Sequence, residues 1–309
     1  MTLVDDRRDL PTTGALISIL VPVHNEQAHL PAMLDSVLAQ TWTDLEIVLV
    51  DDGSTDGTGA ILADYAARDD RVRRVGSGAR LGKVAAFNAA YAASRGRIVC
   101  HVGGDDTMPP DALAHRARAL APFLAVPAVG FFKLELFEHV PGDRPTVIPR
   151  GRRGSMSGPS ITMTRPLADR VMPVPAHLVS EDIWMGRAAD ALADVRVDSP
   201  AVVCHYRRHT GNSNPRNRPF PQMSAAMHER TQALDALLDT ERFELPGEVR
   251  AALTAEVEAE QLRVDGRTSA VLRSDLPVID RLAMASMSRP SLWRVRSRLL
   301  TPLTGWRGR

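Results

Sequence analysis

Two short apolar runs in this sequence each end in a pair of aspartates. The run at 45–50 leads directly into Asp51-Asp52, and the run at 97–102 leads through two glycines into Asp105-Asp106. Runs this short, separated by segments with helical periodicity, are typical of buried strands in a parallel sheet. An open α/β sheet binds its ligands at the carboxyl ends of its strands, so both pairs are expected at one edge. Carboxylates gathered there need a cation or hydrogen-bond donors, which predicts a metal or ligand site.

The first 120 residues alternate between strand and helix patterns. Strands are predicted at 15–23, 45–50, 72–75 and 97–102, with amphipathic helical patterns between them. Pro109 and Pro110 are predicted to lie in the first turn of a further helix. The alternation predicts an α/β fold with a doubly wound, Rossmann-like, mostly parallel sheet and right-handed crossovers.

The second half of the chain is less regular. Strands are predicted at 129–140, 161–164 and 195–207, and a helix is predicted to start at Ser180. Four arginines lie among Gly, Pro and Ser at 141–158, which predicts a basic loop that is either solvated or a lid contacting an anion. A Pro- and Asn-rich linker at 213–222 divides the chain into a domain at 1–215 and a helical region at 216–309.

Charge and cysteine content limit the partners and the compartment. The formal net charge is +1, which argues against nucleic acid as a partner. Cys100 and Cys204 both lie in apolar runs and are predicted to be buried free thiols, which fits a reducing compartment. The polar N-terminus has no apolar signal core, and no uncharged apolar stretch reaches the roughly 20 residues of a membrane span. A cytoplasmic protein is expected.

The C-terminal tail is strongly basic. Residues 289–309 contain six arginines and two tryptophans but no acid. That composition is typical of a segment lying on anionic lipid, here at the inner face of a membrane. The alternative is a helix packed on its own domain with its arginines in water. The sequence also leaves open a homo-oligomer.

Two segments after the first two strands resemble the nucleotide-binding motifs of the family 2 glycosyltransferases, which have the GT-A fold. They are Val21-Pro22-Val23-His24-Asn25-Glu26 and Val50-Asp51-Asp52-Gly53-Ser54-Thr55-Asp56. The resemblance extends from about residue 16 to 214 and includes the motifs below in the family's order. It implies a set of residues that hold the nucleoside: Pro22, His24, Glu26, Asp51 and Asp52. For Asp52 and Asp56 the alternative role is helix capping.

The segment Gly78-Ala79-Arg80-Leu81-Gly82-Lys83, followed by Asn88, also resembles the family. There a basic residue and an asparagine approach the nucleotide, which implies donor contacts for Lys83 and Asn88. A glycine-rich loop before a helix is weak evidence of phosphate binding by itself. A solvated lysine is the alternative.

Gly103-Gly104-Asp105-Asp106 falls where the family has its aspartate-any-aspartate metal motif. The resemblance implies that Asp105 ligates Mg²⁺ or Mn²⁺ on the donor diphosphate, since oxygen ligands suit either ion. Gly103 replaces the first aspartate of the usual pattern. This departure puts the ribose contact in doubt, and Asp106 or a water is the expected substitute.

Ser180-Glu181-Asp182 resembles the family's Glu-Asp motif at the start of a helix. The resemblance implies that Asp182 is the general base that removes the acceptor's hydroxyl proton. Helix capping is the alternative, because acids are favoured at a helix N-terminus.

His205-Tyr206-Arg207-Arg208-His209 resembles a Tyr-Arg-x-His segment of many relatives. It implies that His209 completes the metal sphere and that Arg207 and Arg208 face the diphosphate, which suits the donor fork of a guanidinium. A structural histidine is the alternative for His209.

Together the resemblance implies a metal-dependent, inverting glycosyltransferase. It would move a sugar from a nucleotide-diphosphate sugar, with uridine the expected nucleoside, to a hydroxyl acceptor. Expected acceptors are a polysaccharide or other glycan, a cell-envelope precursor or a secondary metabolite. A sugar nucleotidyltransferase and a non-catalytic sugar-nucleotide-binding protein are the competing hypotheses.

Overall fold

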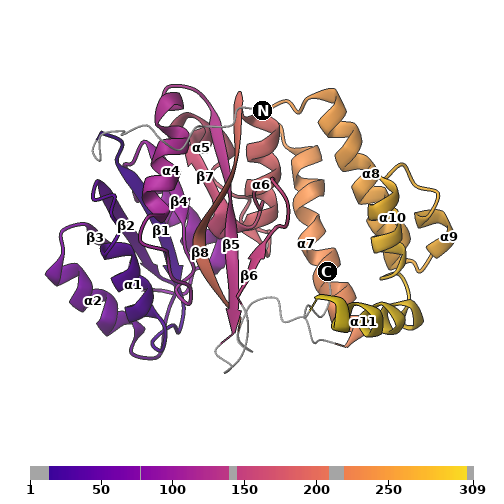
Figure 1. The fold of residues 1–309 in the computed structure, drawn as a ribbon, viewed down its shortest axis with the longest axis horizontal. Coiled ribbons are helices and arrows are strands. Elements are labelled where there is room, and N and C mark those ends of the chain that lie inside the picture. The colour runs from indigo at the N-terminus through magenta and orange to yellow at the C-terminus, as the bar shows by residue number, and fades with distance from the viewer. Residues whose placement is uncertain (1–13, 77, 139–144, 209–218, 305–309) are drawn as a thin grey trace. The chain divides into compact units, whose positions relative to one another are not determined.

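The computed structural model describes residues 14–76, 78–138, 145–208 and 219–304. The chain divides into two compact units, residues 1–209 and 210–309 (Figure 1). The domain boundary predicted at 215–216 lies outside the described residues.

The first unit is built on one mixed sheet of eight strands in its described part, in the order β3-β2-β1-β4-β7-β5-β6, with β8 also paired to β5. Their bounds are β1 Ile17–Val23, β2 Leu45–Asp51, β3 Val72–Val75, β4 Ile98–His101, β5 Ala128–Glu138, β6 Thr146–Ile148, β7 Ile161–Thr164 and β8 Val195–Arg208. The strands from β3 to β4 are parallel, as is the β5–β8 pair. β6 and β7 pair antiparallel with their neighbours. The predicted α/β fold with a mostly parallel sheet is confirmed.

Helices cover both faces of this sheet. They are α1 Leu30–Leu38, α2 Thr58–Arg68, α3 Lys83–Ala93, α4 Ala112–Leu120, α5 Arg165–Val171 and α6 Glu181–Leu192. α1, α2 and α4 contribute buried residues to the main hydrophobic cluster. α3 packs against β1 and β2, and its Phe87 ring meets the edge of His101, which lies on the strand face away from that cluster.

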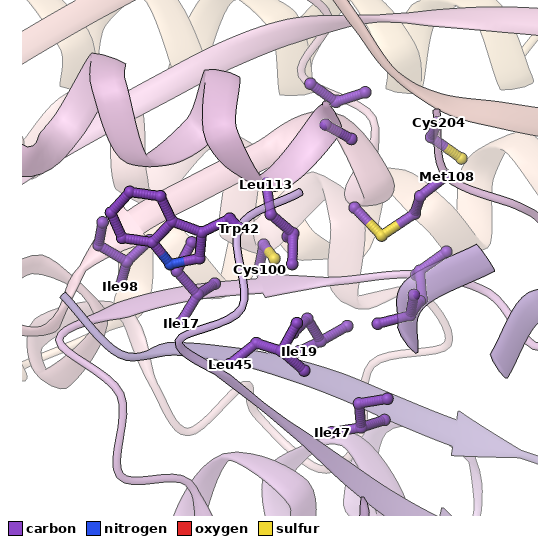
Figure 2. Packing of buried hydrophobic residues seen from close by; sticks show 14 of the residues in the cluster. Ile17, Ile19, Trp42, Leu45, Ile47, Ile98, Cys100, Met108, Leu113 and Cys204 are labelled. Atoms are coloured by element: carbon purple, nitrogen blue, oxygen red, sulfur yellow. The ribbon is translucent and has the colours of Figure 1, made fainter. Parts of the chain in front are cut away.

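The main core forms because alternate residues of each strand point to one face. Ile17 and Ile19 of β1 and Leu45 and Ile47 of β2 belong to it, each at most 4% exposed. Trp42, on the segment before β2, lies close to Ile17 in the same cluster (Figure 2). This packing fixes the register of the parallel strands and therefore the positions of the loops that follow them.

Two sequence predictions need correction. α4 starts at Ala112, so Pro109 and Pro110 precede the helix instead of forming its first turn. A residue before proline is kept out of the helical region, and the Pro110 carbonyl instead accepts the Thr41 N–H. The segment 141–158, predicted to be a loop, contains β6, which pairs with Leu134–Leu136 of β5.

The second unit is helical in its described part, as predicted from the sequence. Its helices are α7 Phe220–Asp239, α8 Gly247–Val264, α9 Thr268–Val271, α10 Val278–Ala285 and α11 Pro290–Thr304. The Arg263 guanidinium is fully buried and makes two hydrogen bonds to the Glu260 carboxylate, at 2.6 and 2.7 Å. It also donates to Ser224 of α7 and to the Met287 carbonyl, so one cation joins three segments. Among the described helices of the whole chain, none has the length and apolar character needed to cross a bilayer.

Candidate functional site

The loops that follow β1 and β2 are held together by hydrogen bonds in both directions. Asn25 N–H donates to Ser54 Oγ at 3.0 Å, and Thr55 N–H donates back to Asn25 Oδ1 at 2.8 Å. Gly57 N–H donates to Gln27 Oε1 at 2.6 Å. Asn25 has a φ of 56°, a left-handed conformation in which asparagine is enriched, and it turns the first loop toward the second. Segments 21–26 and 50–56, which resemble nucleotide-binding motifs, are therefore held together at the carboxyl edge of the sheet. We call these two segments the rim.

The two aspartates at the end of β2 have different surroundings. Asp51 Oδ1 accepts the Ser54 N–H at 2.9 Å and shapes its own turn. Asp52 is 3% exposed, and its Oδ1 accepts the N–H groups of Leu81 and Gly82 at 2.6 and 2.8 Å. The Asp52 carboxylate thus anchors the glycine-containing loop that precedes α3.

A salt bridge joins the start of α3 to the start of α6. Lys83 Nζ lies 2.9 Å from Glu181 Oε1, with the lysine side chain half exposed and the glutamate side chain buried. Both helices begin at these residues, so their positive dipole ends come together. The two helix N-termini favour an anion by their dipoles, while the Lys83 charge is paired with Glu181 and the first turn of α6 also carries Asp182.

The carboxylates of Asp105 and Asp106 converge over Gly103. A methyl group added at Gly103 would lie 2.6 Å from Asp105 Oδ1 and 3.0 Å from Asp106 Oδ2. The space that a side chain at 103 would need is therefore taken by the next two carboxylates of the same loop. Burial, and then the nearby Asp105 carboxylate, raise the pKa of Asp106 well above its usual range.

The end of β8 runs along this loop. Thr107 and His205 exchange backbone hydrogen bonds at 2.8 and 3.2 Å. Arg207 N–H donates to Asp106 Oδ1 at 2.9 Å, and Arg207 Nε donates to the Asp105 carbonyl at 2.8 Å. The Arg207 guanidinium also lies over the Phe137 ring, 4.8 Å from its centroid. A fixed cation therefore stands beside the two carboxylates.

Asp182 approaches the same edge from α6. Its Oδ1 accepts hydrogen bonds from Ser180 Oγ at 2.7 Å and from Ile183 N–H at 2.9 Å. Gly158 lies between Asp182 and His101, the last residue of β4: a methyl group there would be 3.6 Å from Asp182 Cβ and 2.3 Å from His101 Nε2. The start of α6 is thus placed at the carboxyl end of the strand that leads to Asp105.

The remaining residues that the sequence predicts to bind the donor or the metal do not share one environment. Pro22 and Glu26 lie partly exposed on the rim. The Asn88 side chain is bonded to the backbone of Val174. Its Nδ2 donates to the Val174 carbonyl and its Oδ1 accepts the Val174 N–H, both at 2.8 Å. His24 Nε2 lies 3.3 Å from the Asn25 amide, while its Nδ1 is buried with no hydrogen-bond partner. The Arg208 side chain and all of His209 lie outside the described residues.

Sequence reasoning assigned no role to three residues that shape the site. His101 is buried and its Nδ1 has no partner; burial, then Lys83 and Arg116, lower its pKa to about 3. Arg116 of α4 is fully buried and donates to the Pro159 carbonyl at 2.5 Å, next to Gly158. A histidine inside an otherwise apolar strand run, immediately before an acidic loop, was the available signal for His101. Gly158 and Arg116 gave no local signal.

The donor set suits a hard divalent cation. Asp105 lies over Gly103, which leaves its carboxylate room, and oxygen is the ligand that Mg²⁺ and Mn²⁺ prefer, whereas the Asp106 carboxyl is buried and accepts the Arg207 N–H. Within the described part of the chain, no cluster of three or more His, Cys, Asp or Glu side chains could hold a metal. Further ligands would therefore come from water, from a bound diphosphate or from His209.

Comparison with known families identifies the segment that builds this edge. The profile of Glycosyl transferase family 2 matches residues 18–156. This chain carries a glycosyl transferase family 2 domain. The matched segment includes β1 to β6, the interlocked rim and the Asp105-Asp106 loop, whereas α6 and β8 lie beyond it.

Individual relatives agree with this assignment of the family 2 domain. The chain is 43% identical over 91 residues to an uncharacterized glycosyltransferase, EpsJ, of Bacillus subtilis, which covers 29% of this chain and 26% of that protein. It is 39% identical over 98 residues to chondroitin synthase of Escherichia coli, covering 32% of this chain and 14% of that protein. The chain therefore matches less than a third of the length of either relative.

Solved structures extend the likeness beyond the family 2 domain. TarS residues 1–349 of S. aureus, in complex with UDP-GlcNAc, aligns with a TM-score of 0.60 at 19% identity, over 93% of this chain and 85% of that one. The mannosyltransferase PcManGT from Pyrobaculum calidifontis, in complex with GDP-Man and Mn²⁺, aligns with a TM-score of 0.61 at 20% identity, over 97% and 84%. These likenesses show that the fold is GT-A. GT-A glycosyltransferases commonly use a divalent metal.

Proposed function

We propose that the protein is a metal-dependent, inverting glycosyltransferase that uses a nucleotide-diphosphate sugar, with UDP as its expected nucleotide. The observation that carries the proposal is the approach of Asp182 to the carboxyl end of β4, across Gly158 and next to the strand that leads to Asp105. A candidate base and a candidate metal ligand thereby come to the same sheet edge. The family 2 domain and the sugar-nucleotide complexes of its structural neighbours support this reading.

The proposed reaction is a single displacement at the anomeric carbon. Asp182, oriented by Ser180 and the Ile183 N–H, takes the proton of the acceptor hydroxyl. The acceptor oxygen forms the new glycosidic bond, the bond to the diphosphate breaks, and the configuration inverts. A base on the face opposite the leaving group requires no covalent intermediate.

The leaving nucleoside diphosphate gains negative charge, which nearby groups of this chain would stabilise. We assign this role to Lys83, to the N-termini of α3 and α6, and to Arg207, which is held beside Asp105. Asp105 would hold Mg²⁺ or Mn²⁺, which when bound supplies Lewis-acid stabilisation of the same charge, and Asp106 is the proposed substitute for the ribose contact. Arg208 and His209 remain proposed contacts of the diphosphate and the metal.

The proposed nucleoside contacts are Pro22, His24, Glu26 and Asp51 on the rim. For Asp52 and Asn88 the structure supports indirect roles: Asp52 anchors the loop before Lys83, and Asn88 fastens α3 to Val174. The acceptor is proposed to be a hydroxyl of a glycan or cell-envelope precursor, in keeping with chondroitin synthase among the relatives. A cytoplasmic location is proposed because Cys100 and Cys204 are both free and buried.

A donor screen tests the substrate class. Thermal shift is measured with UDP-, GDP- and dTDP-sugars, each with and without Mn²⁺. We expect one nucleotide class to raise the melting temperature, and to do so more with the metal. If no sugar nucleotide produces a shift in either condition, the proposed function is wrong.

Substitution of the proposed base tests the chemistry. Asp182→Asn should lower turnover by a factor of about 10² to 10⁴ while leaving donor affinity near the wild-type value. The matched control is Asp64→Asn, which changes an exposed carboxylate of α2 that forms a surface salt bridge with Arg68. Equal turnover in Asp182→Asn would remove the base assignment. Pyrophosphate release from a nucleoside triphosphate and a sugar phosphate would instead identify a nucleotidyltransferase.

A further inference from the structure

α10 in the second unit presents large apolar side chains to solvent. Ile279 is 80% exposed, Val278 is 60% exposed and Leu282 is 58% exposed. Residues at i, i+1 and i+4 lie on one side of a helix, so these three form a continuous apolar face. A helix that served only to complete its own unit would bury such a face, which therefore indicates an interaction surface.

The apolar face of α10 continues toward α11. Ala283 lies four residues after Ile279, and Ser286 lies four residues after Leu282, so both extend the same face by one turn. Arg296 of α11 donates to Ser286 Oγ at 2.7 Å and to the Ala283 carbonyl at 3.4 Å. α11 therefore crosses the end of this face, and its Val295, next to Arg296, is 56% exposed.

The same region concentrates positive charge. Residues 278–304, which span α10 and α11, contain five arginines and one acid, Asp280, although the whole chain has a net charge of only +1. Arg289, Arg294 and Arg298 are exposed. We call the exposed apolar residues Val278, Ile279, Leu282 and Val295, together with Arg294 and Arg298, the α10–α11 surface.

The combination of apolar and cationic side chains on the α10–α11 surface favours one kind of binding partner over others. A second copy docked face to face would bring the arginines of one α11 toward those of the other, which repels. A nucleic acid would use the arginines but not the exposed Ile279 and Leu282. The interface of an anionic bilayer offers acyl chains for the apolar residues and phosphates for the arginines.

We propose that the α10–α11 surface docks on an anionic phospholipid membrane. The apolar side chains of α10 enter the interfacial region, and the exposed arginines of α11 contact lipid phosphates. This inference rests on the second unit alone and not on the transfer reaction. It extends the contact expected of the basic tail at 289–309 to α10, which carries no excess of basic residues itself.

Vesicle co-sedimentation of the 309-residue chain tests the proposal in the absence of any sugar donor. Vesicles of phosphatidylcholine alone are compared with vesicles that contain roughly 30 mol% phosphatidylglycerol. We expect binding to the anionic vesicles, weakened by salt, and little binding to the neutral ones. Sedimentation that is the same with both vesicles, or absent with both, would overturn the proposal.

Two double variants separate the apolar and the electrostatic parts. Ile279→Ser with Leu282→Ser should weaken the partition coefficient by about tenfold or more. Arg294→Gln with Arg298→Gln should weaken it by about fivefold for each arginine removed. The matched controls are Val147→Ser and Arg74→Gln, exposed residues of β6 and β3 in the first unit, which should bind as the wild type does.

Circular dichroism checks that each variant is folded, and light scattering gives its mass. Binding of both double variants at the wild-type level would contradict the proposal. So would a dimer that Ile279→Ser with Leu282→Ser converts to a monomer without any vesicle binding, because the face would then be a protein interface. Variants that lose vesicle binding should keep the wild-type thermal shift with the sugar donor. Failure of the membrane proposal is therefore distinguishable from failure of the proposed transferase function.

Discussion

Gly158 lies where the His101 ring and Asp182 approach each other, and a side chain there has no space. In Gly158→Ala the new methyl group would be placed 2.3 Å from His101 Nε2, so either the ring or the segment around 158 must move. We expect a loss of about 1 to 3 kcal/mol in the free energy of unfolding, measured by urea denaturation.

The control for this prediction is Gly247→Ala, at the first residue of α8. A methyl group there meets nothing within 4 Å, and the glycine does not have a positive φ. Its stability should be unchanged or rise by up to about 1 kcal/mol. Equal destabilisation of the two variants would show that the contact with His101 is not the cause.

His101 makes a separate prediction about pH. Its folded-state pKa of about 3 lies below the unfolded value of about 6.5, because burial and the nearby Lys83 and Arg116 disfavour the imidazolium. Below pH 6.5 the unfolded chain therefore binds a proton that the folded chain does not. The contribution of the neutral His101 to the free energy of unfolding is present above about pH 6.5. It is lost as the pH falls toward 3, at up to about 1.4 kcal/mol per pH unit.

The measurement compares urea denaturation of wild type and His101→Gln at pH 7 and pH 5. We expect the wild type to lose about 1 to 2 kcal/mol more than the variant over this range. Comparing the change with pH removes any pH-independent cost of the substitution itself. The same pH dependence in both proteins would show that His101 is protonated equally in the folded and unfolded states.

The loop between β3 and α3 is held by the carboxylate of Asp52, the residue that follows β2. In Asp52→Ala the N–H groups of Leu81 and Gly82 lose their acceptor, which held them at 2.6 and 2.8 Å. Hydrogen exchange in this loop should accelerate by about tenfold or more, since a charged hydrogen bond contributes about 1.5 to 3 kcal/mol. Exchange in α2 should stay the same. Asp64→Ala, on the exposed side of α2, is the control that should not change exchange in the loop.

The positions of the main elements could be predicted because hydrophobic runs mark them locally. β3 was predicted at Val72–Val75 and β7 at Ile161–Thr164, as the structure has them. The direction of β7 could not be predicted, because a four-residue strand buried on both faces looks the same in either orientation. β6 was missed because Thr146–Ile148 is short and half-exposed, and only its pairing with β5 makes it a strand.

The candidate site could be predicted where its residues follow strand ends. The Asp51-Asp52 and Asp105-Asp106 pairs come to one edge because β2 and β4 both pair parallel with β1. The contacts of individual side chains could not be predicted, because their partners are far away in sequence. Asn88 bonds to Val174, 86 residues away, and no local pattern contains that pairing. Burial of an unpaired ring, as at His101, is likewise a property of the packed structure.

The buried ion pair between Glu260 and Arg263 is expected to control the stability of the whole second unit. Arg263→Met leaves the Glu260 carboxylate, 2% exposed, without its bidentate partner. Removal of one member of a buried pair typically costs about 3 to 5 kcal/mol. Hydrogen exchange should therefore rise throughout α7 and α8 while β1 and β2 keep their protection.

Two further variants distinguish the charge effect from lost packing. Arg267→Met replaces an exposed arginine only four residues away and should leave exchange unchanged. Glu260→Gln combined with Arg263→Met removes the uncompensated charge and should recover part of the lost stability. If the single and double variants were equally unstable, lost packing and not the buried charge would explain the effect.

The contact of Arg207 with Asp106 joins residues 101 positions apart. During synthesis on the ribosome, the strands from β1 to β4 emerge long before β8, and domains form as their parts become available. The Asp105-Asp106 loop is therefore made with its buried carboxylate still lacking the backbone donor and the cation that will hold it. A nascent chain interrupted before residue 207 would contain the rim and both aspartate pairs in an unfinished arrangement. The candidate site is thus completed only when β8, the last strand of the first unit, has been synthesised.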